Sequence, residues 1–260
     1  RRGEPLRCLR CASVARDGRE RRQVVSRCEL TRSDDHHRRA VVERGCVRRS
    51  HRAVFFKRRT DLDKFSLVPL RLLGNPIYFA HFAITDHHGK KFRYAHRKSA
   101  NGLLDLPASM SDKHYHLRLG DWTIRESNGS HILRASIGKD ITFEATLKPT
   151  KPVVLNGKDG QGVSFKDEGQ ASRYFSYTRM EMDGDIIWNG ETEHFTGSAW
   201  MDREFGTWTP TNNQKGWDWF SVQLENGTEL MCYQLRNAEG GVSPFSSGTF
   251  VDKDGNFTYL

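Results

Sequence analysis

Residues 197–236 read GSAWMDREFG, TWTPTNNQKG and WDWFSVQLENGTELMCYQLR. The first block alternates two sets of side chains, Trp200, Asp202 and Glu204 in one set and Met201, Arg203 and Phe205 in the other. Because successive side chains of a strand point to opposite faces of the sheet, the block predicts a strand with an indole and two carboxylates on one face.

Aromatic side chains are concentrated in the same stretch. Four tryptophans fall within twenty residues, at Trp200, Trp208, Trp217 and Trp219. A wall of aromatic rings beside paired carboxylates suits a pocket for an apolar substrate that needs a proton. Large aromatic side chains also fill the interior of β-barrels, so the pattern has a structural interpretation as well.

From Asn75 onward the chain reads as short strands joined by tight turns. Residues 140–148 alternate apolar and polar side chains, and so do residues 78–84. Hairpin dipeptides occur at His88-Gly89, Asn128-Gly129, Gly138-Lys139, Asp183-Gly184, Asn226-Gly227 and Asp254-Gly255. The pattern predicts an all-β, antiparallel sandwich or barrel, without an amphipathic helix of ten or more residues.

Several of these motifs resemble one protein family. The strings GSAWMDREFG and GWDWFSVQLENGTELMCYQLR, with NPIYFAHFAITD, KFRYAHRKSANGL and SRYFSYTRMEMDGDI before them, are similar to the AttH-like proteins. That family includes carotenoid 1,2-hydratases (hydroxyneurosporene synthases) and chains called predicted secreted hydrolases. The resemblance runs from about Val54 to the end of the chain.

The resemblance implies two lipocalin-like barrels. We expect the first β domain at residues 55–190 and the start of a second at residues 191–260. The chain ends at Leu260 within an expected strand, and the family pattern implies roughly another hundred residues of β structure. The second domain is therefore expected to be incomplete.

Residues 1–54 differ in composition from the rest. They lack Lys, Ile, Asn, Tyr, Phe, Trp and Met, and they hold the cysteines Cys8, Cys11, Cys28 and Cys46. No apolar periodicity is visible, so we expect no packed element here. A basic arm and a small zinc module are two interpretations, since Cys8 and Cys11 form half a zinc site. The composition favours a third, out-of-frame or mis-started translation of a GC-rich gene.

The net charge of +9 belongs to the N-terminal quarter. Residues 1–60 carry a net charge of +12 and residues 61–260 a net charge of −3. Nucleic-acid binding therefore rests on the basic N-terminal segment alone and is not expected of the folded part. The chain shows no signal peptide and no run of eighteen apolar residues, so no transmembrane segment is expected. The family resemblance implies a periplasmic or secreted bacterial protein.

Asp202 is the first candidate for a catalytic residue, with Glu204 as the second carboxylate. Burial among aromatic rings and the nearby Glu204 would raise the pKa of Asp202 and make it a proton donor. In the matching motif of carotenoid hydratases, an acid is thought to protonate a terminal double bond. The hydratases tend to have Tyr where this chain has Trp200. The structural alternative pairs the two acids with Arg203 and Arg179 or with backbone donors.

Aromatic side chains are the candidates for substrate binding. A tertiary cation formed by protonation would be stabilised by ring faces, for which we select Trp200, Trp219, Tyr174 and Tyr177. Trp217 and Trp219 project from one face of their strand and would line a barrel interior. Asp218 points the other way and is expected at most to cap a turn.

Histidine and serine give weaker candidates. A zinc ion could be bound by His81, His114 and His116. However, the sequence shows no carboxylate placed to hydrogen-bond to these imidazoles, and we expect neither a metal nor a cofactor. His194 precedes Asp202 by one short strand and could orient it. Neither Ser176 nor Ser198 lies in a G-x-S-x-G elbow, which argues against a serine-hydrolase mechanism.

The sequence thus predicts a protein that binds a hydrophobic, isoprenoid-like or lipid-like small molecule in a β-barrel or an inter-barrel cleft. Acid-catalysed hydration or cyclisation with Asp202 as donor is the enzymatic hypothesis. In a second enzymatic hypothesis, the protein catalyses cyclisation by holding the substrate in a reactive shape, without acid chemistry. The alternative is a protein that is not an enzyme: a lipocalin-type carrier that binds the molecule without converting it.

Overall fold

The computed structural model describes residues 25–32, 49–55, 78–86, 89–100, 106–111, 113–206 and 213–260. These ranges do not include Trp208, Cys8, Cys11 or Cys46. Within them the chain forms antiparallel β structure with a single 3-10 turn, η3 (Lys158–Gly160), and no α-helix. The predicted all-β, antiparallel, lipocalin-like fold is confirmed. Among the described residues no helix has the length and apolar character needed to cross a membrane.

The chain divides into two compact units. The larger unit comprises residues 23–153 and 175–205, and the smaller unit includes residues 154–174 and 206–260. The boundary that we expected near Glu191 falls within the larger unit, and the expected domains stay a prediction. Strand β12 (Gln170–Trp188) is 19 residues long and contributes its first five residues to the smaller unit and the rest to the larger.

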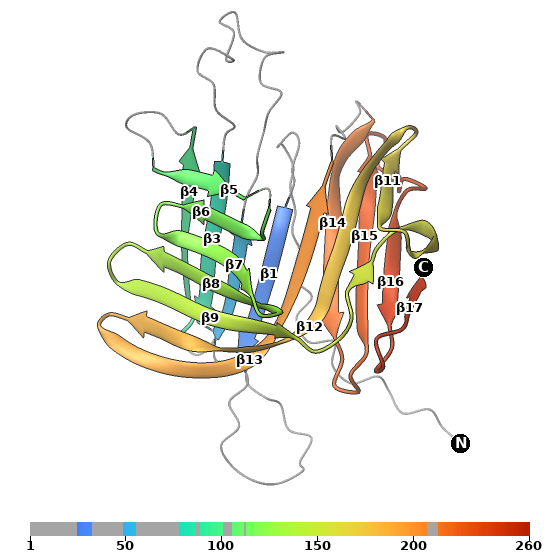
Figure 1. Cartoon of the computed structure of the whole chain (residues 1–260). Helices are drawn as coiled ribbons and strands as arrows, with labels where there is room; N and C mark the ends of the chain where they lie inside the picture. Colours follow the sequence, from blue (N-terminus) through green and yellow to red (C-terminus); the bar gives the residue numbers. More distant parts are fainter. Residues whose placement is uncertain are drawn as a thin grey trace, which may run out of the picture. The chain divides into compact units, whose positions relative to one another are not determined.

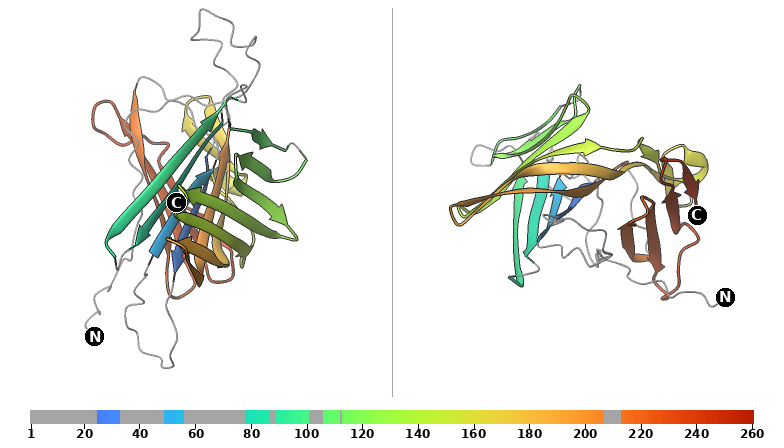
Figure 2. Two further views of the ribbon diagram at one scale, coloured as in Figure 1. Left: turned by 90° about the vertical axis from the view of Figure 1, so that its left-hand side faces the viewer. Right: turned by 90° about the horizontal axis from the view of Figure 1, so that it is seen from below.

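The strands of the larger unit follow one another through antiparallel pairing in the order β4-β3-β2-β1-β13-β12-β9-β8-β7-β6-β5. Figure 1 and Figure 2 show β1–β4 running across β6–β9, so that the two groups face each other as layers. Besides β12, their bounds are β1 (Val25–Arg32), β2 (Arg49–Phe55), β3 (Tyr78–Asp86), β4 (Lys91–Ser99), β5 (Ala108–Met110), β6 (His116–Leu119), β7 (Trp122–Ser127), β8 (Ser130–Ile137), β9 (Ile141–Pro149) and β13 (Glu191–Phe205).

The smaller unit contains a four-stranded antiparallel sheet in the order β14-β15-β16-β17. Two further short strands pair with the first part of β12. The bounds are β10 (Val154–Leu155), β11 (Val163–Asp167), β14 (Gln214–Gln223), β15 (Glu229–Asn237), β16 (Ser247–Val251) and β17 (Phe257–Tyr259).

A hydrophobic core fills the larger unit between its layers. Two strands supply it as the sequence predicts, because their alternate residues are buried: Tyr78, Ala80, Phe82 and Ile84 of β3, and Ile141, Phe143, Ala145 and Leu147 of β9. The ring of Phe143 stacks on Phe195 at 5.3 Å between centroids and tilts against Phe82 at 5.6 Å. Alternation in these strands therefore determines which side chains form the core.

Of the six expected hairpin dipeptides, four lie between consecutive strands, one (His88-Gly89) includes a residue outside the described ranges, and one lies inside a strand. Asn128-Gly129 shows the expected geometry, with positive φ at both residues (52° and 75°) between β7 and β8. Asp183-Gly184 was expected to form a turn, but it lies inside β12. The turn that ends β12 is Asn189-Gly190, again with positive φ at both positions (54° and 87°).

Gly184 is explained by close backbone approach instead of by a turn. A Cβ atom at this position would lie 2.2 Å from the carbonyl oxygen of Glu144 and 2.7 Å from Cα of Ala145 on the paired strand β9. Glycine inside a strand commonly marks a place where another backbone comes very near.

Two strands lie within the segment that we expected to contain no regular element. β1 pairs with β13 from Val25↔Glu204 to Arg32↔Gly197, and β2 pairs with both β1 and β3. Strand pairing uses backbone N–H and C=O groups, which every residue except proline carries. A stretch without an alternating pattern can therefore still join a sheet.

Gly184→Ala tests the close approach of β9 and β12. Because the added methyl group meets backbone atoms that cannot move independently, we expect the free energy of unfolding to fall by about 2 kcal/mol or more, measured by urea denaturation. Gly138→Asn is the control, since Gly138 has φ 58° with open space around it and Asn tolerates this conformation. Equal effects of the two substitutions would contradict the steric explanation.

Candidate functional site

Asp202 is a buried acid in the larger unit. Its residue surface is 5% exposed, on strand β13 beside the buried Trp200. Its Oδ1 atom accepts two hydrogen bonds, from Ser176 Oγ at 2.6 Å and from the indole Nε1 of Trp200 at 2.9 Å. The predicted association of Trp200 with Asp202 thus exists, through the polar edge of the indole. Glu204, two residues further along, is half-buried.

The structural alternative for Asp202 stays a prediction beside the catalytic one. The described donors to Asp202 are a hydroxyl and an indole, whereas Arg203 places its guanidinium 4.6 Å from the ring centroid of Tyr115. Two neutral donors on one oxygen stabilise negative charge, and burial opposes it.

His194 does not orient Asp202. Its side chain is exposed, with Nδ1 3.0 Å from Asp185 Oδ1 and Nε2 3.4 Å from Asp183 Oδ2. The hairpin that joins β12 to β13 brings His194 opposite these residues. Eight positions of strand, at about 3.3 Å each, separate it from Asp202. The expectation is therefore wrong.

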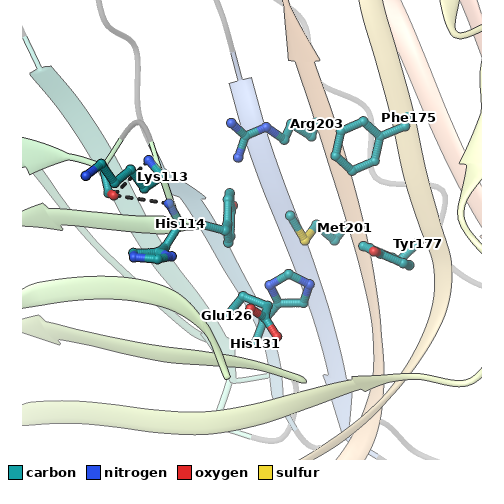
Figure 3. Close-up of a pocket in the computed structure, with 10 residues that line it drawn as sticks. Lys113, His114, Glu126, His131, Phe175, Tyr177, Met201 and Arg203 are labelled. Carbon is teal, nitrogen blue, oxygen red and sulfur yellow. Dashed lines mark hydrogen bonds between the residues drawn. The ribbon is translucent and has the colours of Figure 1, made fainter. Parts of the chain in front are cut away.

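A pocket of about 360 Å³ opens in the larger unit (Figure 3). It lies on the other face of β13 from Asp202, because Met201 and Arg203 line it while their neighbours point away. Its lining residues come from β7, β8, β12, β13 and the segment before β6: Ser111, Lys113, His114, Tyr115, Glu126, His131, Phe175, Tyr177, Met201 and Arg203.

His131 is the buried titratable group of this pocket, 6% exposed. Burial is the largest cause of a lowered pKa for its imidazole; the charge of Arg203 also lowers the pKa, and that of Glu126 raises it. Rings surround it, since Tyr115 meets it edge-on at 5.2 Å and Tyr177 lies at 5.6 Å between centroids. We therefore treat His131 as neutral at pH 7.

The structure separates Tyr177 from Asp202, although we expected both in one site. Tyr177 lines the pocket, whereas the preceding Ser176 hydrogen-bonds to Asp202 on the other side of the strand. Tyr177 also contacts the core, as does Met182, five positions along β12. Residues five apart in a regular strand face opposite ways, so the alternation of β12 shifts between them, as at a β-bulge.

Tyr174 and Trp219 form a polar cluster inside the smaller unit. The indole Nε1 of Trp219 donates to the hydroxyl of Tyr174 at 3.1 Å. The buried Lys166 places Nζ 4.4 Å from the ring centroid of Tyr233 and 5.7 Å from that of Tyr174, and donates to Ser164 Oγ at 2.9 Å. Within this unit the aromatic faces already have a cationic group of the protein beside them.

Trp217 and Trp219 lie on the same face of β14 as expected, opposite Leu235 and Tyr233 of β15. Trp217 is half-buried and Trp219 is buried. Asp218, which we expected to cap a turn, instead forms an ion pair with Arg236, with Oδ2 3.3 Å from Nε.

The three histidines considered as zinc ligands have different surroundings. His81 faces outward on β3 with its ring 6.2 Å from that of His96, while His114 lines the pocket. Among the described residues no group of three or more His, Cys, Asp or Glu side chains could hold a metal ion.

Sequence reasoning missed His131, Tyr115 and Lys166. For His131 a signal was present, because the alternation of β8 places it on the apolar face with Leu133 and Ala135. A histidine on such a face deserves testing as a site residue. Tyr115 and Lys166 lie in stretches rich in polar residues and turns, where the sequence carries no periodic signal.

Comparison with known proteins places the chain in a family. A model described as AttH-like matches residues 47–260, and the chain belongs to the AttH-like family. The match includes strand β2, whose first six residues lie within the segment 1–54 that we expected to fall outside the family fold. No match was found among curated proteins.

Two solved structures share the fold. A crystal structure assigned to AttH from Nitrosomonas europaea has 22% sequence identity and a TM-score of 0.69, covering 92% of this chain and 68% of that one. Kievitone hydratase from Nectria haematococca has 11% identity and a TM-score of 0.63, covering 92% of this chain and 64% of that one. The chain thus spans about two thirds of either protein.

The lowered pKa of His131 predicts a pH dependence of stability. Above about pH 6.5 the imidazole is neutral in both states. As the pH falls below that value, the unfolded chain takes up a proton that the folded protein does not, so the free energy of unfolding decreases until the folded pKa is reached. We expect His131→Gln to lose less stability than the wild type between about pH 7 and pH 5, in urea denaturation.

His116→Gln is the control for this measurement, because it removes an exposed imidazole of the same unit. It should follow the wild-type pH profile. A His131→Gln profile parallel to that of the wild type would show that burial does not keep His131 neutral.

Proposed function

We propose that the protein is a hydratase-like acid catalyst that binds an unsaturated hydrophobic small molecule and protonates it from Asp202. The observation that carries the proposal is the buried carboxyl group held by Ser176 and Trp200. Membership of the AttH-like family and the shared fold with kievitone hydratase support it. At 11% identity the latter supports the fold, and its reaction enters only as a hypothesis.

The proposed step begins at the Asp202 carboxyl group. Its Oδ1 stays hydrogen-bonded to Ser176 and Trp200, which fixes the direction of the acid. The carboxyl proton adds to one carbon of the double bond and leaves a tertiary cation at the other. Water then forms a C–O bond to the cation, and the proton lost by that water returns to Asp202. Burial favours this chemistry, because it removes competing water from the acid.

Trp200 is the aromatic group proposed to stabilise the cation, since its indole lies beside the acid. Glu204 is proposed as the second carboxylate of the site. The sequence assigned Tyr174 and Trp219 a similar role to Trp200. The amino group of Lys166 near the ring of Tyr174 argues against a second positive charge at that ring, because like charges repel.

A lipocalin-type carrier without turnover is the second candidate. It is favoured by the pocket of the larger unit, whose volume of about 360 Å³ lies at the small end of the range for ligand sites. Phe175, Tyr177 and Met201 supply apolar walls there. A carrier needs such walls but no acid.

Hydration can be tested with geranylgeraniol and kievitone as probes in ¹⁸O-labelled water. We expect the wild-type product of one of them to gain one labelled water by mass spectrometry. Asp202→Asn should lower this rate at least about a hundredfold, because the amide keeps the shape but cannot donate the acid proton. Binding of the probe, followed by tryptophan fluorescence, should survive within about tenfold.

Stability separates the catalytic from the structural role. The amide oxygen of Asn can still accept from Ser176 and Trp200, so we expect Asp202→Asn to change the free energy of unfolding by less than about 1 kcal/mol. Asp185→Asn, which changes an exposed acid on β12, is the matched control and should leave turnover intact. Two results would contradict acid catalysis and leave the carrier: unchanged turnover in Asp202→Asn, or no turnover of either probe by the wild type.

A further inference from the structure

The pocket of the larger unit contains an arginine whose guanidinium donors have no partner among the described residues. Arg203 is half-buried, and its guanidinium stacks over Tyr115 at 4.6 Å and lies 5.8 Å from the ring centroid of Phe205. Within the described residues it makes neither a hydrogen bond nor an ion pair. Stacking occupies the faces of a guanidinium and leaves its in-plane N–H groups available to a planar acceptor.

The charges around the pocket favour an anionic ligand. Arg203 and Lys113 are cationic, and Glu126 is the single carboxylate of the lining. Glu126 is exposed, and its Oε1 already accepts the backbone N–H of Gly129 at 2.8 Å. Because Arg203 is less accessible to water than Glu126, its charge is screened less. His131, held neutral by burial, adds no charge at pH 7.

The walls of the pocket favour a flat, unsaturated ligand. Phe175 meets Tyr177 edge-on at 6.3 Å, and the ring of His131 lies 5.6 Å from Tyr177. Figure 3 shows Phe175, Met201 and Tyr177 along one side of the pocket, with Arg203 next to Phe175. A volume of about 360 Å³ suits a molecule with one or two rings.

We propose that this pocket binds a small aromatic carboxylate, with the carboxylate held by the in-plane N–H groups of Arg203 and the ring set against Phe175 and Tyr177. A carboxylate matches the fork of a guanidinium through two parallel hydrogen bonds. The site is separate from the proposed acid, because Asp202 points to the opposite face of β13. It therefore adds a second ligand class to the proposed function.

Titration calorimetry with 4-hydroxybenzoate and benzoate, against benzamide, tests the proposal. Benzamide keeps the ring but has no charge, so we expect it to bind at least about tenfold more weakly than benzoate. Arg203→Gln should weaken benzoate binding at least about tenfold and leave benzamide unaffected. Arg203→Lys, which keeps the charge but loses the planar fork, should fall between the wild type and Arg203→Gln.

Three controls make the outcome decisive. Arg134→Gln removes an exposed arginine outside the pocket, and it should bind benzoate like the wild type. Asp202→Asn should also bind benzoate normally, which keeps this test distinguishable from that of hydration. Thermal melting checks that each variant is folded. Equal affinity for benzoate and benzamide, a normal affinity in Arg203→Gln, or no binding of either acid by the wild type would overturn the proposal.

Discussion

One arginine links the end strand β4 of the larger unit to the layer that faces it. Strand β4 is one end of the order of paired strands. Arg97 of β4 forms an ion pair with Asp121, donates to Ser136 Oγ at 3.1 Å and stacks 4.4 Å above the buried Trp122. Burial is the largest single influence on the Asp121 carboxyl and raises its pKa, but the hydrogen bonds from Arg97 and Ser136 together lower it below the usual value. Through these contacts Arg97 links β4 to the start of β7 and to β8, the strands from which the pocket residues Glu126 and His131 project.

Strand alternation gives the two candidate sites their separation. Along four residues of β13, Trp200 and Asp202 are buried and joined by a hydrogen bond, while Met201 and Arg203 face an aromatic pocket with excess positive charge. One strand thus presents an acid on one side and a cation on the other, and the two are not paired with each other in any described contact. A substitution at either position can be interpreted for one site, since the backbone of the strand separates them.

Much of the fold was predictable from the sequence, and less of the site was. Alternation identified β3 and β9 with their core residues, because apolar burial enforces period two. It also placed Trp200 with Asp202. The shift of alternation in β12 separated Tyr177 from that acid, and no local residue pattern signals such a bulge. Gly184 was predicted to lie in a turn because glycine is common in turns. It is also common where two backbones come very close, as they do here. The contacts of Arg203 and Lys166 depend on partners far along the chain, which single-sequence reasoning does not provide.

The central claim is that Asp202 is a proton donor, and its protonation state at neutral pH tests this most directly. Carbon-13 NMR of protein labelled at the aspartate carboxyl carbons gives that state, with Asp202→Asn identifying the resonance. The account predicts the chemical shift of a neutral carboxylic acid at pH 7, unchanged when benzoate fills the pocket on the other face of β13. The shift of an ionised carboxylate at pH 7 would contradict it, because a group without a proton cannot begin the reaction.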